Sequence, residues 1–401
     1  MDERRRNTIG YVIMAAVLAG LLAGAFILSR TLPEPEGFAV VSNWRKAWMM
    51  GDFSPEAQNL ESWTDLAPAI EKSLEYIKAK PGGETAFVSE KVSLTWSQIE
   101  RSLMELKLVL PHLDDKPSLI AERFEWLELG RDVLATGYYT PLLKASEVRT
   151  EEYRYPLYTV PEDLKTLDLG EFHPRWEGQR LTYRMRDGTP VPYYDRGEID
   201  FEDALEGRDL EVAWAGDLVE IFFLHIQGSG MLEYEDGTRR YVLYAGKNGR
   251  AYSSLGREMI RRGLLKREGV SMQSIRKYLR DNPEQARELL STNPSYVFFK
   301  LGDTGPFGAM GRLLTPRVSV ATDPSLFPLG SLLLLRMELP PEEPGGNPTK
   351  MNGLVLAQDT GGAIKGARLD LFCGMGREAE YMAGHMKNKA RVALLISKNV
   401  L

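Results

Sequence analysis

The chain has 401 residues, of which 43% are hydrophobic and 26% charged, enough for about two to three domains with packed cores. A formal net charge of −6 offers no extended basic surface of the kind that a nucleic-acid partner requires, which makes nucleic acid a poor candidate partner. A single cysteine, Cys373, excludes an internal disulfide. The four histidines show no metal-ligand spacing, so we expect neither a metal nor another cofactor.

The amino terminus has the composition of a membrane segment. Residues 7–29 carry no charge and follow three arginines at 4–6. At about 1.5 Å per residue, a helix of this length crosses a hydrocarbon core of about 30 Å, and the arginines stay on the cytoplasmic side. The rest of the chain is therefore expected outside the cytoplasm. The alternative for residues 1–30 is a signal peptide cleaved near Ala23-Gly24-Ala25. The Pro- and Glu-rich residues 31–37 are interpreted as a linker.

Residues 38–140 are predicted to form a helical region that leads into a β-rich part of the chain. Apolar residues recur at helical spacing over 55–78 and 94–110, which predicts two packing helices. Residues 135–143 then form a short run that contains Gly137 and ends near Pro141. This pattern predicts a buried strand that stops at a turn.

A second β-rich domain is predicted over residues 141–303. The apolar run 218–227 is interpreted as a strand, and Gly228-Ser229-Gly230 separates it from another strand at 231–234. Two helices are expected after these strands, at 253–262 and 272–290, with Asn282-Pro283 interrupting the second.

The remaining residues, 304–401, are predicted to form most of a small closed β-barrel. Its strands are short apolar runs between Gly- and Pro-rich turns: 296–299, 318–321, 332–335, 354–357, 369–372 and 392–396. One helix near 378–387 interrupts them, and residues 340–346 are expected in an exposed loop. The fold class is therefore mainly β with flanking helices (α+β).

The densest polar feature is the loop from Gln358 to Asp370, which contains three glycines. Glycines permit strained turns and close approach of a ligand to the backbone. Asp359 and Asp370 lie at the two ends of this loop, and paired carboxylates suit acid/base chemistry, with Asp323 as a third candidate. The alternative is that these aspartates only cap turns.

Two Asp-Thr-Gly triplets suggest a different chemistry. Asp303 and Asp359 each begin such a triplet, as do the aspartates of aspartic peptidases, where two carboxylates share one proton. Those enzymes place a small polar residue after the glycine, whereas Pro306 and Gly362 stand here. The departure disfavours the peptidase interpretation.

Several sequence blocks resemble one protein family. Gly311-Arg312, 318–323, Pro328-Leu329-Gly330 and 359–370 are similar to the three-aspartate domain, a double-psi β-barrel, of the membrane-bound lytic murein transglycosylase A family. Four further blocks are similar in the same order: 135–141, 226–230, 244–252 and 293–300. The resemblance covers the chain from about residue 135 to its end.

This resemblance implies a double-psi β-barrel domain interrupted by a second β-rich domain, with a glycan strand of peptidoglycan bound in a groove between them. It also implies that Asp370 is the catalytic residue, with Asp359 and Asp323 as supporting acidic groups. The implied reaction cleaves the β-1,4 bond from N-acetylmuramic acid to N-acetylglucosamine and leaves a 1,6-anhydromuramyl end. The implied location is the periplasmic side of a bacterial membrane.

The chain departs from many members of this family in having no lipidation cysteine near its amino terminus. Its first 130 residues match less clearly, so they receive no functional assignment. A non-catalytic protein that binds the cell wall remains the competing function, because a fold does not fix an activity.

Other residues are candidates for contacts in the groove. Tyr138 and Tyr139 can stack on sugars or belong to the core. Four residues on glycine-rich loops can hydrogen-bond the substrate or hold tight turns: Gln227, Ser229, Lys247 and Asn248. Lys365 either offsets charge between the two loop aspartates or points to solvent.

Overall fold

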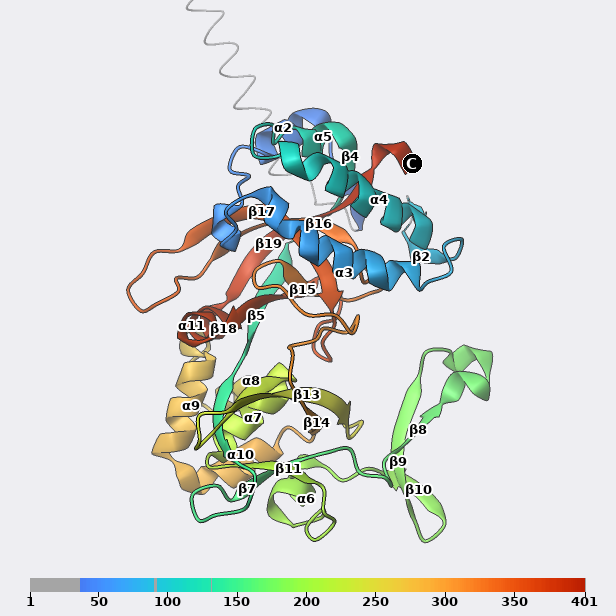
Figure 1. Ribbon diagram of the computed structural model, residues 1–401. Helices are drawn as coiled ribbons and strands as arrows, with labels where there is room; N and C mark the ends of the chain where they lie inside the picture. The colour runs from blue at the N-terminus through green and yellow to red at the C-terminus, as the bar shows by residue number, and fades with distance from the viewer. Residues whose placement is uncertain (1–36, 90–91, 131, 401) are drawn as a thin grey trace, which may run out of the picture.

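The computed structural model describes residues 37–89, 92–130 and 132–400 (Figure 1). They form two bodies, one above the other in Figure 1, and the chain enters the lower body after residue 140 and leaves it near residue 302. The expected membrane segment at 1–30 lies outside the described residues. Among the helices that are described, none has the length and apolar character needed to cross a membrane.

The upper body is a closed six-stranded β-barrel, as predicted. Its strands follow one another in a ring: β19 (Lys387–Ser397), β16 (Leu332–Leu339), β17 (Thr349–Asp359), β15 (Ser319–Ala321), β18 (Arg368–Met375) and β5 (Val133–Thr140), which pairs again with β19. β4 (Phe124–Leu129) and β1 (Phe38–Val40) extend the sheet from β19. The strand expected at 296–299 forms, as β14 (Val297–Gly302), but its assignment to the barrel is wrong: it belongs to the lower body, and β5 completes the barrel.

Both faces of the barrel wall are buried. Leu333 and Leu335 of β16 point into the interior cluster, whereas Leu332 and Leu334 pack outward. This alternation is the period of two that a strand imposes. The outer face is covered by α3 (Ala67–Lys78) and α4 (Trp96–Val109), whose leucines and isoleucines join the outer cluster. Two-sided burial explains why these strands appear in the sequence as continuous apolar runs.

The helix predicted over 94–110 is confirmed as α4, which Thr95 and Gln98 begin with a capping box. The helix predicted over 55–78 is an α-helix only from Ala67 onward, because Asn59 adopts a left-handed conformation and Ser62 caps a separate 3-10 turn. The other elements of this body are α2 (Asn43–Met49), η1 (Glu56–Gln58), η2 (Trp63–Leu66), β2 (Thr85–Val88), β3 (Ser93–Thr95), η3 (Leu110–His112), α5 (Leu119–Arg123), α11 (Arg377–His385) and η8 (Lys398–Val400).

The lower body, here called the insert, is built on a six-stranded sheet. Its order is β14 (Val297–Gly302), β13 (Arg239–Lys247), β12 (Gly230–Tyr234), β6 (Leu142–Ser146), β11 (Glu211–Ala215) and β7 (Tyr155–Tyr158). The edge strands β7 and β14 also contact each other, so the sheet is a partly closed barrel. A ribbon of β8 (Lys165–Asp168), β9 (Arg180–Arg186) and β10 (Thr189–Pro192) projects from it, with η4 (Leu169–Glu171) and η5 (Pro174–Trp176) at the tip (Figure 1).

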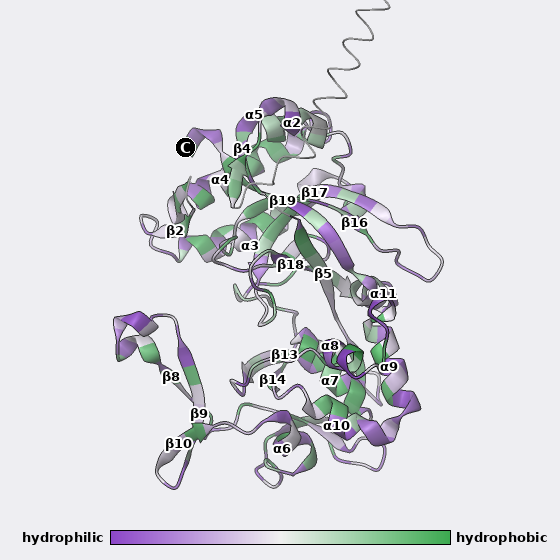
Figure 2. Ribbon diagram, turned by 180° about the vertical axis from the view of Figure 1, so that it is seen from behind, coloured by the Kyte–Doolittle hydropathy of each residue, from purple (hydrophilic) through white to green (hydrophobic). Residues whose placement is uncertain are grey.

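The strand predicted over 218–227 is wrong, because this segment is the helix α7 (Leu218–Gln227). Asp217 caps its first turn, and Gly228, with φ of 82°, ends it. Ile221 and Leu224 pack on the sheet, whereas Phe222 and Phe223 pack on other helices. Burial on both sides removes the helical hydrophobic period, and Figure 2 shows α7 as largely hydrophobic.

The helices predicted after these strands are confirmed, including the break at Asn282-Pro283. They are α8 (Leu255–Arg261), α9 (Met272–Asp281), η7 (Pro283–Gln285) and α10 (Ala286–Ser291). The insert also contains α6 (Arg196–Phe201) and η6 (Arg267–Gly269).

Candidate active site

Three neighbouring barrel strands bring together the two ends of the glycine-rich loop. Ala321 of β15 pairs with Asp359 of β17 on one side and with Asp370 of β18 on the other. Because adjacent strands lie about 4.8 Å apart, the two aspartate backbones are about 10 Å apart. Asp323 follows β15 by two residues. The loop aspartates therefore share one region of the barrel.

Asp370 has the environment of a carboxyl group that retains its proton to a higher pH than an ordinary aspartate does. It is half-buried, and its Oδ1 is inaccessible to solvent and has no hydrogen-bond partner. Burial raises its pKa to about 6, the charge of Asp359 adds to this, and Thr136 and Arg368 oppose it. A carboxyl group with such a pKa can donate a proton and accept one near neutral pH.

Thr136 and Arg368 form the polar neighbourhood of Asp370, and the sequence reasoning missed both as site residues. Thr136 of β5 pairs with Asp370 across the strands. Its hydroxyl accepts a hydrogen bond from Arg368 Nη2 at 3.3 Å and donates one to the Leu369 carbonyl at 3.3 Å. For Arg368 the sequence did contain a signal: residues 368 and 370 are two apart at the start of a predicted strand, so their side chains lie on the same face.

Asp359 is held differently, by three donors. Tyr138 Oη donates to its Oδ2 at 2.8 Å, and the backbone N–H groups of Ala309 and Thr360 donate to its Oδ1 at 2.8 Å each. Burial raises the pKa of Asp359, although these hydrogen bonds stabilise its charged form. Burial, followed by the charge of Asp359, raises the pKa of Tyr138 well above its usual value, so its hydroxyl remains a donor. Both oxygens of Asp359 are thus engaged.

Asp323 fastens the glycine-rich loop. It accepts hydrogen bonds from the Gly366 N–H at 2.7 Å and from the backbone and hydroxyl of Ser325 at 3.1 and 2.8 Å. Partial burial works against its ionisation, but these hydrogen bonds and the charge of Lys365 outweigh it and lower the pKa of Asp323. The Lys365 side chain itself is exposed.

The carboxylate pair of an aspartic peptidase does not form. Asp303 is 93% exposed at the end of β14, and its ion-pair partner at 3.9 Å is Arg240. Both oxygens of Asp359 accept hydrogen bonds from other groups. A dyad requires two carboxylates that share one proton, so this geometry contradicts the peptidase interpretation.

Two groove candidates lie in structural positions instead. Tyr139 is 4% exposed, and its hydroxyl accepts a hydrogen bond from Arg276. Asn248 is fully buried, and its amide joins the carbonyls of Tyr194 and Pro294 while its Oδ1 accepts from two backbone N–H groups. These are the core and turn-holding roles that the sequence left open for them.

The other insert candidates lie near the junction of the two bodies or on the surface. Gln227, at the end of α7, accepts the Tyr139 N–H at 3.0 Å through Oε1. Ser229 is half-buried in the turn that follows, and Lys247 is exposed at the end of β13. Gln227 therefore helps to hold β5 in position.

The insert also contributes Tyr252, which the sequence reasoning missed as a site residue. Burial raises the pKa of Tyr252, and the charges of Arg368 and Asp370 also influence that pKa, so the insert loop that carries Tyr252 lies on the side of the barrel site. The side chain is 42% exposed. Its loop begins after β13, where the backbone of Gly249 packs against Thr182 of β9. The candidate site therefore lies between the barrel and the insert. Within the described part of the chain, no cluster of three or more His, Cys, Asp or Glu residues could hold a metal ion.

Known proteins share this architecture. Residues 134–300 match the family model of the MltA specific insert domain, and residues 318–396 match that of the 3D domain. The "Membrane-bound lytic murein transglycosylase A" of Escherichia coli (strain K12) is 37% identical over 282 residues, 67% of this chain and 68% of that protein. The match spans about two thirds of the length of the curated relatives.

Two solved structures have the same fold. The membrane-bound lytic murein transglycosylase from Agrobacterium tumefaciens is 28% identical, with a TM-score of 0.75 over 90% of this chain and 98% of that chain. Escherichia coli MltA with bound chitohexaose is also 28% identical, with a TM-score of 0.65 over 83% and 90% of the two chains. Both structures support the double-psi barrel with its inserted β-rich domain. The chain therefore belongs to the MltA family of membrane-bound lytic murein transglycosylases.

Proposed function

We propose that this chain cleaves the β-1,4 bond between N-acetylmuramic acid and N-acetylglucosamine in peptidoglycan, with Asp370 as its single acid/base. The environment of Asp370 carries the proposal: a carboxyl group with a pKa near 6 and an unpartnered oxygen, on a barrel strand beside Thr136. Hydrolytic glycosidases ordinarily use two carboxylates. Here the second carboxylate, Asp359, is engaged by three donors, which favours a reaction that needs only one.

The reaction takes place in two proton transfers. Protonated Asp370 gives its proton to the glycosidic oxygen, and the bond to the muramyl C1 breaks as N-acetylglucosamine leaves with a hydroxyl group. The resulting carboxylate then takes the proton of the muramyl 6-hydroxyl, whose oxygen bonds to C1. The product is a 1,6-anhydromuramyl end, and Asp370 regains its proton. No water is consumed.

The surrounding residues tune this group. Burial, with a smaller effect of the negative charge of Asp359, raises the pKa of Asp370, and Thr136 and Arg368 stabilise the carboxylate that forms midway through the reaction. Tyr138 holds Asp359 in place. Asp323 supports the loop between the two aspartates. Ser229, Lys247 and Lys365 remain candidates for substrate contacts.

The substrate is a glycan strand bound between the two bodies. The family relative bound to chitohexaose supports an extended sugar chain as ligand. Tyr252 is partly exposed and its pKa is influenced by the charge of Asp370, which supports a path for the glycan along this junction. We further propose that residues 7–29 anchor the chain in the membrane with the enzyme on the periplasmic side, in accord with the membrane-bound name of the relatives.

Mass spectrometry of murein sacculi digested with the purified chain tests this function, with an Asp370→Asn variant in parallel. We expect anhydromuramyl products from the parent and none from the variant. Products with reducing-end muramic acid would identify a hydrolase instead. Binding to sacculi without release of any product would favour the non-catalytic wall-binding protein.

A further inference from the structure

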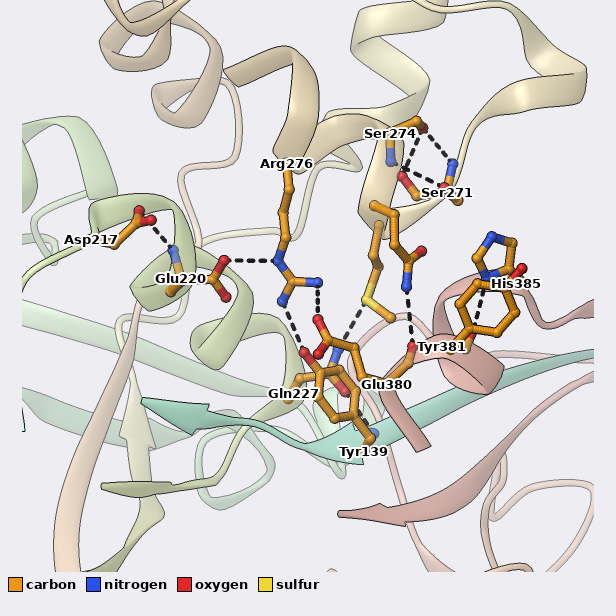
Figure 3. Close-up of polar contacts among 12 residues, drawn as sticks. Tyr139, Asp217, Glu220, Gln227, Ser271, Ser274, Arg276, Glu380, Tyr381 and His385 are labelled. Atoms are coloured by element: carbon orange, nitrogen blue, oxygen red, sulfur yellow. Dashed lines mark hydrogen bonds and ion pairs between the residues drawn. The ribbon is translucent and has the colours of Figure 1, made fainter. Parts of the chain in front are cut away.

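A buried arginine that the reaction does not use joins the two bodies. Arg276 lies on α9 of the insert, and its side chain is 6% exposed. Its Nη1 donates to Glu380 Oε1 at 2.7 Å, and its Nη2 donates to the Tyr139 hydroxyl at 2.8 Å. Its Nε forms an ion pair with Glu220 Oε1 at 3.1 Å (Figure 3). One guanidinium thus contacts α7, α11 and β5.

These contacts cross the junction between the insert and the barrel. Glu380 belongs to α11, which packs on β5 and β18 of the barrel, whereas Glu220 belongs to the insert. Beside the ion pair, Gln273 Nε2 donates to the Glu380 carbonyl at 3.2 Å. A Cβ on Gly384 of α11 would lie 2.3 Å from the amide end of the Gln273 side chain, which would then have to move.

Tyr139 connects the junction to the catalytic residues. Successive residues of a strand point to opposite faces, so Tyr138 and Tyr139 diverge. The Tyr138 hydroxyl holds Asp359, while the Tyr139 hydroxyl is held by Arg276. The Tyr139 N–H is also held, by Gln227 of the insert at 3.0 Å. A shift of the insert would therefore move the strand that carries Thr136 and Tyr138.

We propose that Arg276 is a positioning residue that fixes the orientation of the insert on the barrel, and with it the placement of the glycan against Asp370. Its effect on catalysis rests on the proposed function, whereas its effect on orientation does not. Arginine suits this role because its planar group directs five N–H donors in fixed directions. Lysine would keep the charge but could not hold Glu220, Glu380 and the Tyr139 hydroxyl in the same geometry.

The test compares two weakened junctions with a matched control. Arg276→Lys keeps the charge, and Glu380→Ala removes the barrel-side partner while Arg276 stays paired with Glu220. The control, Arg280→Ala, removes another partner of Glu220 at 2.7 Å, but the Arg280 side chain is 56% exposed and the ion pair lies wholly within the insert. Spin labels are placed on Leu108→Cys in α4 and Val148→Cys in the insert, which replace residues 69% and 64% exposed. Cys373 is buried and stays unlabelled.

In the full detergent-solubilised chain, we expect Arg276→Lys and Glu380→Ala to broaden the distribution of label distances and to lower kcat about 10- to 100-fold on sacculi. KM should change much less, and Arg280→Ala should match the parent in both measurements. Unchanged distances in Arg276→Lys and Glu380→Ala would overturn the proposal, as would broadened distances with normal kcat. If the parent releases no anhydromuramyl product, the proposed function fails, and the distances still decide whether Arg276 orients the insert.

Discussion

The carboxyl group of Asp370 is subject to opposing influences. Burial and the charge of Asp359 favour its protonated form, whereas Thr136 and Arg368 favour the carboxylate. The balance leaves its pKa at about 6. Because the proposed reaction begins with the protonated acid, kcat/KM is expected to fall as pH rises through about 6.

Two substitutions should shift the pH at which kcat/KM falls, hereafter the limb of the pH profile, in opposite directions. Arg368→Gln removes a cation, which raises the pKa of Asp370 and shifts the limb to higher pH. Asp359→Asn removes an anion, which lowers that pKa and shifts the limb to lower pH. We expect shifts of about half a unit to one unit, measured from kcat/KM across the pH range. Equal limbs in the parent and both variants would show that Asp370 does not set the profile.

The same residue should limit the stability of the protein. In the unfolded chain an aspartate loses its proton near pH 3.8, but folded Asp370 keeps it to about pH 6. The contribution of Asp370 to the free energy of unfolding is therefore greatest below about pH 4, decreases between about pH 4 and pH 6, and stays low above about pH 6. Asp370→Asn removes the buried charge and should stabilise the protein by about 1–3 kcal/mol at pH 7.5, with little effect at pH 4.

Thermal and denaturant unfolding at both pH values measure this effect. Asp323→Asn is the control of opposite sign, because the folded protein lowers the pKa of Asp323 and its charge contributes stability at pH 7.5. A loss of stability in Asp370→Asn at pH 7.5 would contradict the account of a destabilised buried carboxylate.

At the scale of elements, the hydrophobic pattern identified most barrel strands, because Gly- and Pro-rich turns separate their apolar runs. It also identified the helix α4, because apolar residues recur there at helical spacing. It failed for α7, where burial on both faces hides the helical period and only Asp217 and Gly228 mark the ends. It also assigned β14 to the barrel, because the pattern shows that a strand is buried but not in which sheet.

The loop after β13 shows how a turn can place a site residue. Gly249 has φ of 74°, and an added Cβ would lie 2.4 Å from the Cβ of Thr182. We expect Gly249→Ala to push β9 away. The backbone N–H of Asn248, which donates to the Tyr296 carbonyl, should then exchange its hydrogen faster. Gly178 has nearly the same φ, 75°, but open space around it. Gly178→Ala therefore controls for backbone strain alone, and equal exchange at Asn248 in both variants would rule out the contact with Thr182.

At the scale of the whole molecule, the site depends on the relation between the two bodies. Thr136, Asp359 and Asp370 lie on different barrel strands, and Tyr252 comes from the insert. The sequence marked the aspartates because they flank a glycine-rich loop. Thr136 and Tyr252 lie in the blocks 135–141 and 244–252 that carry the family resemblance, but the sequence did not single them out, because their relation to Asp370 depends on strand register and on packing across the junction. The same holds for Arg276, which resembles any charged residue of an amphipathic helix until its partners are known.

The amino-terminal segment should determine how the chain is attached to the membrane. Residues 7–29 are uncharged and follow Arg4, Arg5 and Arg6, so an uncleaved segment would hold the enzyme at the membrane while its catalytic body reaches the wall. We expect the full chain to sediment with membranes, to resist extraction by high salt and to be released by detergent. The intact mass of the purified protein should include these residues. A mature protein that begins just after Ala25 and stays soluble would instead identify a cleaved signal peptide, and glycan cleavage would then occur without a tether.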